Sequence, residues 1–209
     1  ELQLGSRLLQ LSGQTLVGGK AQVTAEEGQF DGLLKAQSLV LAVNQANSRG
    51  KLHSREGIAW LGQQLTTGPD SELIANQSVT LTGQKLALGG TVGAGKALNI
   101  KGQQVGQTGT LVSGQALTIE ADTLSLDGET EANAVEIHAD EMNVAGKVRG
   151  NDVQLAAGKL SNQGEVQAGE TLSWQGNELD NQGSLQGDSA WCSRARACVT
   201  RAPWPVATL

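Results

Sequence analysis

The stretch VTLTGQKLALGGTVGAGKA (79–97) is followed directly by LNIKGQQVGQTGTLVSGQA (98–116) and LTIEADTLSLDGETEANA (117–134). Each segment has an apolar–any–apolar opening, then a further apolar residue and then a glycine. The openings begin at Val79, Leu98 and Leu117, so the pattern recurs after 19 residues. A fixed period in this range is typical of a solenoid, in which each repeat stacks on its neighbours.

The same opening recurs along almost the whole chain, with successive starts 18 to 21 residues apart. The ten opening pairs are Leu2/Leu4, Ala21/Val23, Leu39/Leu41, Ile58/Trp60, Val79/Leu81, Leu98/Ile100, Leu117/Ile119, Val135/Ile137, Val153/Leu155 and Leu172/Trp174. The continuity of the repeat predicts one solenoid domain over residues 1–187. Because the chain begins in phase with the repeat, we expect it to be a piece of a longer array.

Three further positions share this phase. Eleven residues after each start stands a glycine, except that Pro69 takes its place in the fourth segment. We interpret these glycines as tight turns or positions of positive φ. Apolar residues stand seven residues after each start, with Gly28 as the exception, and two residues after the glycine in most segments. Each segment therefore has four positions for buried apolar side chains.

The openings alternate between apolar and polar residues. Their middle residue is polar in most segments: Gln3, Gln22, Thr80, Asn99, Thr118, Glu136, Gln154 and Ser173. Alternation with a period of two indicates a half-buried strand. No stretch of helical length shows a sustained 3.6-residue period, so helices are not expected. The pattern predicts an all-β fold, a β-helix of about ten coils with three short strands in each and roughly 19 residues per coil.

Composition limits the class of protein. Aromatic residues make up 2% of the chain and there is no tyrosine, which suits a narrow solenoid core of small branched side chains. The net charge of −6 and the lack of a basic stripe argue against nucleic acid as a partner. No apolar run is long enough to span a membrane. The amino terminus has no charged segment followed by an apolar core, so no signal peptide is recognised.

The repeat pattern stops near Gly187. The tail, DSAWCSRARACVTRAPWPVATL (188–209), contains Cys192 and Cys198, and two of the three prolines. We expect residues 188–209 to leave the helix, as a disordered or out-of-frame extension. The alternatives are a disulfide-closed cap or a basic docking tail, and Trp191 or Trp204 could cover the last coil.

Two late segments carry a family resemblance. LSNQGEVQAG (160–169) and LDNQGSLQGD (179–188) resemble the Leu-x-Asn-x-Gly-x-Leu core of haemagglutinin repeats. Such repeats build the shafts of filamentous haemagglutinins and of the large exoproteins that deliver contact-dependent growth-inhibition toxins. The resemblance covers residues 2–187 and implies a right-handed parallel β-helix, exported by two-partner secretion across the outer membrane of a Gram-negative bacterium. The secretion domain of the family has no counterpart here, and neither does a toxin domain, so the resemblance implies a shaft segment.

Candidate sites are few. Residues 102–146 contain no Lys or Arg but include eight carboxylates: Glu120, Asp122, Asp127, Glu129, Glu131, Glu136, Asp140 and Glu141. They indicate a solvated acidic face, with a calcium site or a docking face at 120–141 as the alternative; no EF-hand or nonapeptide calcium motif accompanies them. His53 and His138 stand more than four coils apart and cannot share a metal. We therefore predict no catalytic, cofactor-binding or metal-binding residues.

Two local features break or mark the repeat. The fourth segment contains an insertion, TTGPDSEL (66–73), which predicts a slightly larger turn, with a binding loop as the alternative. Asn162 and Asn181 share one phase in adjacent coils, which predicts a ladder of side-chain amides.

The leading interpretation is a non-catalytic shaft of a secreted, surface-exposed adhesin or toxin carrier, a monomeric rod without a cofactor. Its expected partners, reached through the parent protein, are a cell-surface receptor or glycan and an outer-membrane transporter. The alternative is an enzyme: a β-helical polysaccharide-acting enzyme or a hexapeptide-type acyltransferase. The former needs clustered Asp, Lys or Arg with long loops, and the latter a strict six-residue apolar spacing; the sequence has neither.

Overall fold

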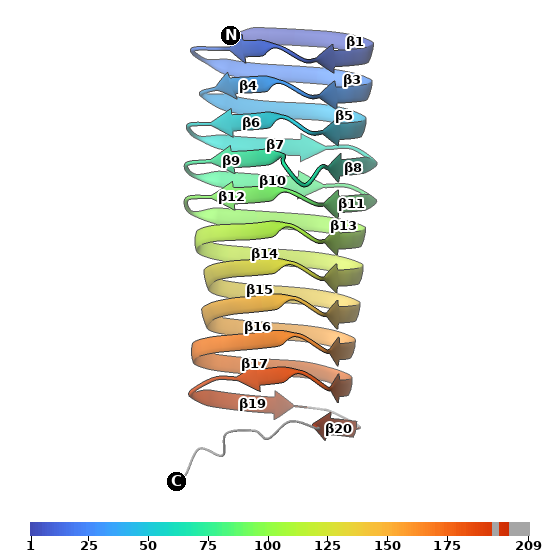
Figure 1. The fold of residues 1–209 in the computed structure, drawn as a ribbon, viewed down its shortest axis with the longest axis vertical. Coiled ribbons are helices and arrows are strands. Elements are labelled where there is room, and N and C mark those ends of the chain that lie inside the picture. The colour runs from blue at the N-terminus through green and yellow to red at the C-terminus, as the bar shows by residue number, and fades with distance from the viewer. Residues whose placement is uncertain (194–196, 201–209) are drawn as a thin grey trace.

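The computed structural model describes residues 1–193 and 197–200. These residues form a β-solenoid of about ten stacked coils, and the part described contains no helix, so none that could cross a membrane (Figure 1). Every strand pairing is parallel, and equivalent residues of successive repeats face one another, as Leu98 faces Leu117 and Ile100 faces Ile119. The all-β solenoid predicted from the period is confirmed.

The strands follow one another around the coils. They are β1 (Leu2–Leu11), β2 (Gln14–Leu16), β3 (Lys20–Phe30), β4 (Leu33–Ala36), β5 (Ser38–Ser48), β6 (Lys51–Ser54), β7 (Gly57–Leu61), β8 (Gln64–Thr67), β9 (Glu72–Ala75), β10 (Ser78–Thr82), β11 (Lys85–Leu88), β12 (Thr91–Ala94), β13 (Ala97–Gln107), β14 (Thr110–Leu126), β15 (Glu129–Val144), β16 (Lys147–Asn162), β17 (Glu165–Asn181), β18 (Ser184–Gln186), β19 (Ser189–Ser193) and β20 (Ala197–Thr200).

Three short strands per coil, as the sequence predicts, occur only in part of the rod. The coil that contains β10, β11 and β12 follows this pattern. From β13 to β17, single strands of 11 to 17 residues continue around the corners. β14, for example, pairs with β12 through Thr110–Ser113 and with β13 through Ala116–Leu126. The backbone hydrogen bonds between coils thus continue through the bend, although the apolar pattern in the sequence predicts separate strands on its two sides.

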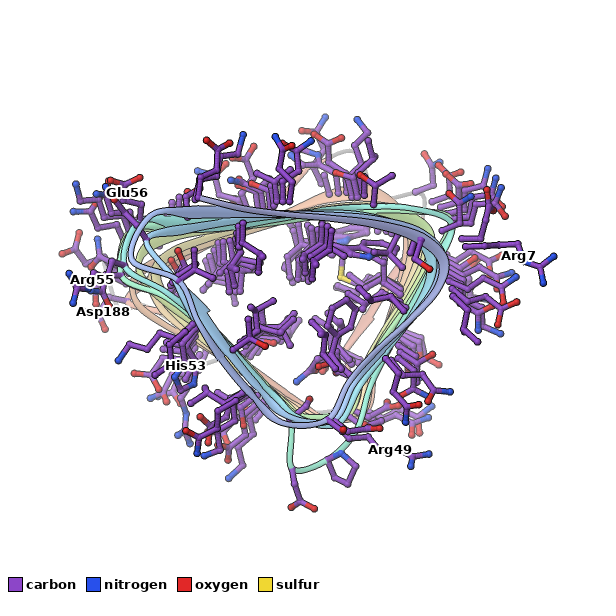
Figure 2. All side chains as sticks on the ribbon, turned by 90° about the horizontal axis from the view of Figure 1, so that it is seen from above. Arg7, Arg49, His53, Arg55, Glu56 and Asp188 are labelled. Atoms are coloured by element: carbon purple, nitrogen blue, oxygen red, sulfur yellow. The ribbon has the colours of Figure 1, made fainter. Side chains whose placement is uncertain are left out.

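Six columns of side chains point into the rod, where four were expected. Figure 2 looks down these columns through a triangular outline. In the coil that begins at Leu98, the predicted members are Leu98, Ile100, Val105 and Leu111, all buried. The two additional columns pass through Gln107 and Ser113. The Gln107 column consists of Leu11, Phe30, Ser48, Thr67, Leu88, Gln107, Leu126, Val144, Asn162 and Asn181.

Gly28 is the one exception in the Val105 column, and its neighbour explains it. A Cβ at Gly28 would lie 3.0 Å from Cε2 of Phe30 and 2.9 Å from Cγ1 of Val43. The Phe30 ring, 1% exposed, occupies the volume that a larger residue at position 28 would fill. One large side chain in the Gln107 column therefore replaces an apolar residue in the adjacent column.

The recurrent glycine lies at a turn between strands, as expected, but positive φ does not explain it. None of the 28 glycines has a φ in the left-handed region, so positive φ is the wrong explanation. Instead, a Cβ on Gly109 would lie 2.0 Å from the carbonyl oxygen of Gly90 in the preceding coil. The same clash, at 2.0 to 2.2 Å, would arise at Gly32, Gly50, Gly90, Gly128, Gly146, Gly164 and Gly183. Glycine recurs at these positions because the coils approach too closely here for a Cβ.

The insertion in the fourth segment is a slightly larger turn, as predicted. Ser71, 1% exposed, takes the place of the turn glycine, and Pro69 and Asp70 are the added residues between β8 and β9. The Ser71 hydroxyl donates a hydrogen bond to the carbonyl oxygen of Gly68 at 2.8 Å. The Thr67 hydroxyl accepts one from the backbone N–H of Gly89 at 2.9 Å. These bonds hold the turn against the rod.

The end of the solenoid differs from the expectation. Residues 188–209 were expected to leave the helix, but β19 pairs with β17 from Ser189 to Ser193, and β20 pairs with it from Ala197 to Thr200. The expectation is therefore wrong for these two segments, because ladder pairing uses backbone groups and does not require the repeat's side-chain pattern. The structure does not describe the side chains of Trp191, Cys192 and Cys198, and Trp204 lies outside the described residues, so the expectations of a disulfide and of a tryptophan cover fall outside what it describes.

Candidate functional surfaces

A shallow groove runs along one corner of the rod. Over five coils it encloses about 790 Å³. Its floor consists of small residues four positions after each opening: Gly102, Ala121, Ala139, Ala157 and Gly176. A second stretch of the same corner, of about 700 Å³, runs past Ala25 and Gly62 near the amino-terminal end. The groove therefore follows the repeat, and does not interrupt it.

At the two floor glycines that follow a tryptophan, the preceding coil leaves no room for a side chain: a Cβ on Gly176 would lie 1.9 Å from the carbonyl oxygen of Ala157, and one on Gly62 would lie 1.9 Å from that of Val43. The tryptophan rings beneath add to this restriction. A Cβ on Gly176 would lie 2.7 Å from Cζ2 of Trp174, and one on Gly62 would lie 2.7 Å from the same atom of Trp60. Both indole rings are buried, at 2% and 3% exposure. The recurrence of Gly or Ala at this position is visible in the sequence and could have predicted the groove.

One wall of the groove carries charges of both signs. Lys101 donates to Glu120 across one coil step, with 2.5 Å between Nζ and Oε2. This hydrogen bond lowers the pKa of Glu120 and raises the pKa of Lys101. Asp122 and Asp140 lie on the opposite wall. Because the walls are exposed, water screens these charges and the ion pair contributes little to stability.

The eight carboxylates of the acidic stretch do not form one face. Glu120, Asp122 and Asp140 line the corner groove. Glu129 lies beside Lys147 on a second side of the rod, and Glu141 lies beside Lys159 on a third side. A single acidic face at 120–141 is therefore wrong, since consecutive carboxylates point in different directions around the coil. No group of three or more His, Cys, Asp or Glu side chains that could hold a metal ion occurs in the described part of the chain.

His53 belongs to a small charged cluster. Glu72 lies in the next coil and bonds to two side chains. Its Oε1 accepts a hydrogen bond from Lys51 Nζ at 2.7 Å, and its Oε2 lies 2.9 Å from His53 Nε2. The hydrogen bonds from Lys51 and His53 lower the pKa of Glu72. His53 and Glu72 are each 30% exposed, so the cluster lies at the surface. It joins two coils and contains no nucleophile.

His138 lies on the outer surface, far along the chain from His53. Its Nε2 is 2.9 Å from Oε1 of Glu136 on the same strand, and its side chain is 51% exposed. Among the described side chains, neither histidine has a second imidazole or a thiol beside it to complete a metal site. The structure thus leaves them apart, as their sequence positions predict.

The predicted amide ladder is present inside the rod. Asn162 donates through Nδ2 to Oδ1 of Asn181 at 2.6 Å and to the carbonyl oxygen of Ser184 at 3.2 Å. Gln107, which sequence reasoning missed, belongs to the same column; its Oε1 accepts from the backbone N–H of Gly128 at 3.2 Å. These buried amides bind one coil to the next, and they face away from solvent. Their role is structural.

Comparisons with protein-family models, with curated proteins and with solved structures find no match.

Proposed function

We propose that the chain is a non-catalytic shaft segment of a large secreted, surface-exposed bacterial protein, an adhesin or a contact-dependent toxin carrier. The observation that carries this proposal is the regularity of the stack. Inward columns remain in register from the first coil to the last, and the one insertion is held against the rod by Ser71 and Thr67. A rod of this kind keeps its two ends a fixed distance apart.

The surface chemistry supports a mechanical role over catalysis. Ligand pockets are typically enclosed and mostly apolar, with a few converging polar groups. The corner groove is open, and its charged residues recur along the rod without converging. The three aromatic residues with described side chains, Phe30, Trp60 and Trp174, are buried and offer no stacking platform for a sugar ring. Any receptor or glycan contact of this segment would then be a shallow polar surface.

The repeat similarity to haemagglutinin shafts supports the proposed location. In this proposal the parent protein crosses the outer membrane of a Gram-negative cell through a two-partner transporter and reaches its receptor through other domains. Asn162 and Asn181, which belong to the shared Leu-x-Asn-x-Gly phrase, hold adjacent coils together. The shared phrase is thereby explained as a requirement of the shaft and not as a binding motif.

Antibodies against residues 1–209 test the surface location. We expect them to label intact cells of the bacterium that produces the protein, and protease added outside to remove the signal. A periplasmic protein serves as the control and should be labelled only after the outer membrane is permeabilised. Labelling of the chain that also requires permeabilisation would contradict the proposal. Release of oligosaccharides from a polysaccharide panel by the purified chain would favour the enzyme alternative.

A further inference from the structure

One face of the rod carries charges of both signs around an uncharged centre. It is formed by β6, β9 and β12 and by the first residues of β14, β15, β16 and β17, which pair in this order, and His53 in Figure 2 belongs to it. Its first outward column is Lys51, Glu72, Thr91, Thr110, Glu129, Lys147 and Glu165. Its second column, two residues further along each strand, is His53, Ile74, Gly93, Val112, Glu131, Arg149 and Gln167. We call this surface the Val112 face.

The centre of the Val112 face is small and partly apolar. Thr91 and Gly93 lie there beside Thr110 and Val112 of the next coil, and the Val112 side chain is 38% exposed. The charged residues of both columns lie in the coils on either side of these two. An apolar centre within a polar rim is the usual layout of a protein–protein interface. The face is therefore suited to a protein partner.

The charges of the Val112 face are complementary to themselves in an antiparallel arrangement. A two-fold axis that runs along the strand at Thr110 sets the faces of two antiparallel rods against each other. Glu72 lies two coils before Thr110 and Lys147 two coils after it, so each Glu72 faces the Lys147 of the other copy. Lys51 and Glu165, three coils before and after, face each other in the same way. The other facing pairs contain no two charges of like sign: Thr91 with Glu129, His53 with Gln167, Ile74 with Arg149 and Gly93 with Glu131.

Other arrangements of the same two faces bring like charges together. A shift of one copy by one coil sets Glu72 against Glu129 or, in the other direction, against Glu165. Parallel rods, related by an axis along the rod over the second column, set Glu131 against Glu131 and Arg149 against Arg149. Like charges that face each other at an interface oppose binding. The charges therefore favour the antiparallel arrangement centred on Thr110.

We propose that two copies of the chain associate side by side and antiparallel through the Val112 face, with Glu72 of each copy paired to Lys147 of the other. Because the coils have the same spacing in both copies, the facing pairs stay in register along the contact. Seven coils of about 34 Å and strands of about 17 Å give a contact of roughly 1,200 Å² in total, at the low end for a specific complex.

The proposed dimer is weak and concentration-dependent, and it closes at two copies because each copy uses the same face. Both ends of each rod stay free, so further coils of a longer array are compatible with it. The proposal goes beyond the shaft function and does not depend on it. It replaces the expectation of a monomeric rod.

A charge exchange between two variants tests the association by sedimentation velocity over a concentration series. The wild-type chain should approach the mass of two copies. Glu72→Lys alone sets two lysines against each other, and Lys147→Glu alone sets two glutamates against each other. Each change should raise the dissociation constant at least about tenfold, since two like-charge contacts replace two ion pairs. An equimolar mixture of the two variants should dimerise again, because the introduced lysine of one copy faces the introduced glutamate of the other.

Lys159→Glu is the matched control. Lys159 lies in the same coil as Lys147 and also stands between two glutamates of adjacent coils, Glu141 and Glu178, but on another side of the rod. This variant should dimerise like wild type. A folding defect cannot explain recovery on mixing. If circular dichroism shows that Glu72→Lys or Lys147→Glu has lost its β-signal, Lys51→Glu mixed with Glu165→Lys repeats the same exchange.

Four results would overturn the proposal. The first is a wild-type chain that stays monomeric throughout the series, and the second is a mass that grows beyond two copies. The third is a folded single variant that dimerises like wild type. The fourth is a mixture of folded variants that stays monomeric, which would also exclude the antiparallel register, because only that register sets the two exchanged charges against each other.

Discussion

A single methyl group is enough to test why glycine recurs at the turns. Gly109 approaches the carbonyl oxygen of Gly90 so closely that a Cβ would lie 2.0 Å from it, and its φ is ordinary. The atoms in the way belong to the backbone of Gly89 and Gly90, which cannot rotate aside as a side chain can. The restriction is therefore steric and acts between coils.

We predict that Gly109→Ala lowers the free energy of unfolding by about 2–3 kcal/mol, because two coils must separate locally. Gly106→Ala in the same coil is the matched control, since its Cβ would meet nothing within 4 Å. That change should be neutral or slightly stabilising, because alanine restricts the unfolded chain. Urea unfolding followed by circular dichroism measures both. Equal losses in the two variants would refute the steric explanation.

The alternation of the openings predicts a second contrast between neighbouring residues. Ile100 is 1% exposed, and Asn99 is exposed between Thr80 and Thr118 of the adjacent coils. Ile100→Asp should cost more than about 3 kcal/mol, because it places an unpaired charge among apolar side chains. Asn99→Asp should change stability by less than about 0.5 kcal/mol. Similar thermal shifts in both variants would mean that the alternation is inverted.

Between strands, polar side chains inside the rod act as cross-links. The Gln107 column contains, besides its apolar members, five buried polar residues: Ser48, Thr67, Gln107, Asn162 and Asn181. The Nδ2 group of Asn162 donates hydrogen bonds to Oδ1 of Asn181 and to a backbone carbonyl oxygen at the same time. A buried acceptor that loses its donor costs more than the net gain from the bond, so partial removal of the ladder is the damaging change.

We predict that Asn162→Leu lowers the free energy of unfolding by about 1–3 kcal/mol, since it leaves Oδ1 of Asn181 without its donor. Adding Asn181→Leu should recover part of this loss, because Leu88 and Leu126 show that the column accepts leucine. A double-mutant cycle measured by urea unfolding gives the coupling. A double variant that loses at least the sum of the two single losses would contradict this assignment.

The cluster that joins β6 to β9 predicts a dependence on pH. The pKa of Glu72 is lowered from its ordinary 4.5 by hydrogen bonds from Lys51 and His53. A carboxyl group whose pKa is lowered in the folded state stabilises the fold when the pH is above its ordinary pKa. This contribution is lost as the pH falls through the pKa of the folded state. Glu72→Gln should therefore reduce the melting temperature by about 1–3 °C at neutral pH.

The difference between Glu72→Gln and wild type should shrink and disappear as the pH is lowered below 4.5. Glu27→Gln is the control, because Glu27 forms no ion pair among the described residues. Scanning calorimetry across the pH series checks both variants. A difference for Glu72→Gln that persists undiminished in acid would exclude the ion pairs as its cause.

For the molecule as a whole, the period was sufficient to predict the stack, four of its six inward columns and the position of the turns. The Gln107 column was not predicted because Ser48 and Gln107 are polar and resemble outward-facing residues. The Ser113 column was not predicted because Ala36 and Ala94 are only weakly apolar. The corner groove was within reach of the sequence, because Gly or Ala recurs four residues after most of the openings. β19 and β20 escaped because backbone pairing tolerates a change in side-chain pattern.

Removing residues 188–209 tests how much the last pairings matter. Each coil contacts only its neighbours, so the loss should be confined to the final coil and most of the β-signal should remain. In the truncated chain Trp60 and Trp174 are the only tryptophans. With Trp60→Phe, the fluorescence of Trp174 should shift to the red and become accessible to acrylamide. With Trp174→Phe, that of Trp60 should not change. Cooperative unfolding of the truncated chain would show that the end is an obligatory cap.

Parallel registration also has a consequence for heredity. Ala97 and Ala116 occupy equivalent positions, as do Leu98 and Leu117. A recombination event that deleted codons 98–116 would join Ala97 to Leu117 and set Val79 against Leu117, a pairing of the kind already present. The inward columns would stay continuous and the rod would shorten by one coil, about 4.8 Å. The reverse event would lengthen it equally. The length of the rod can thus change between lineages by whole coils. No intermediate needs to lose its fold, as it would if a globular core were shortened.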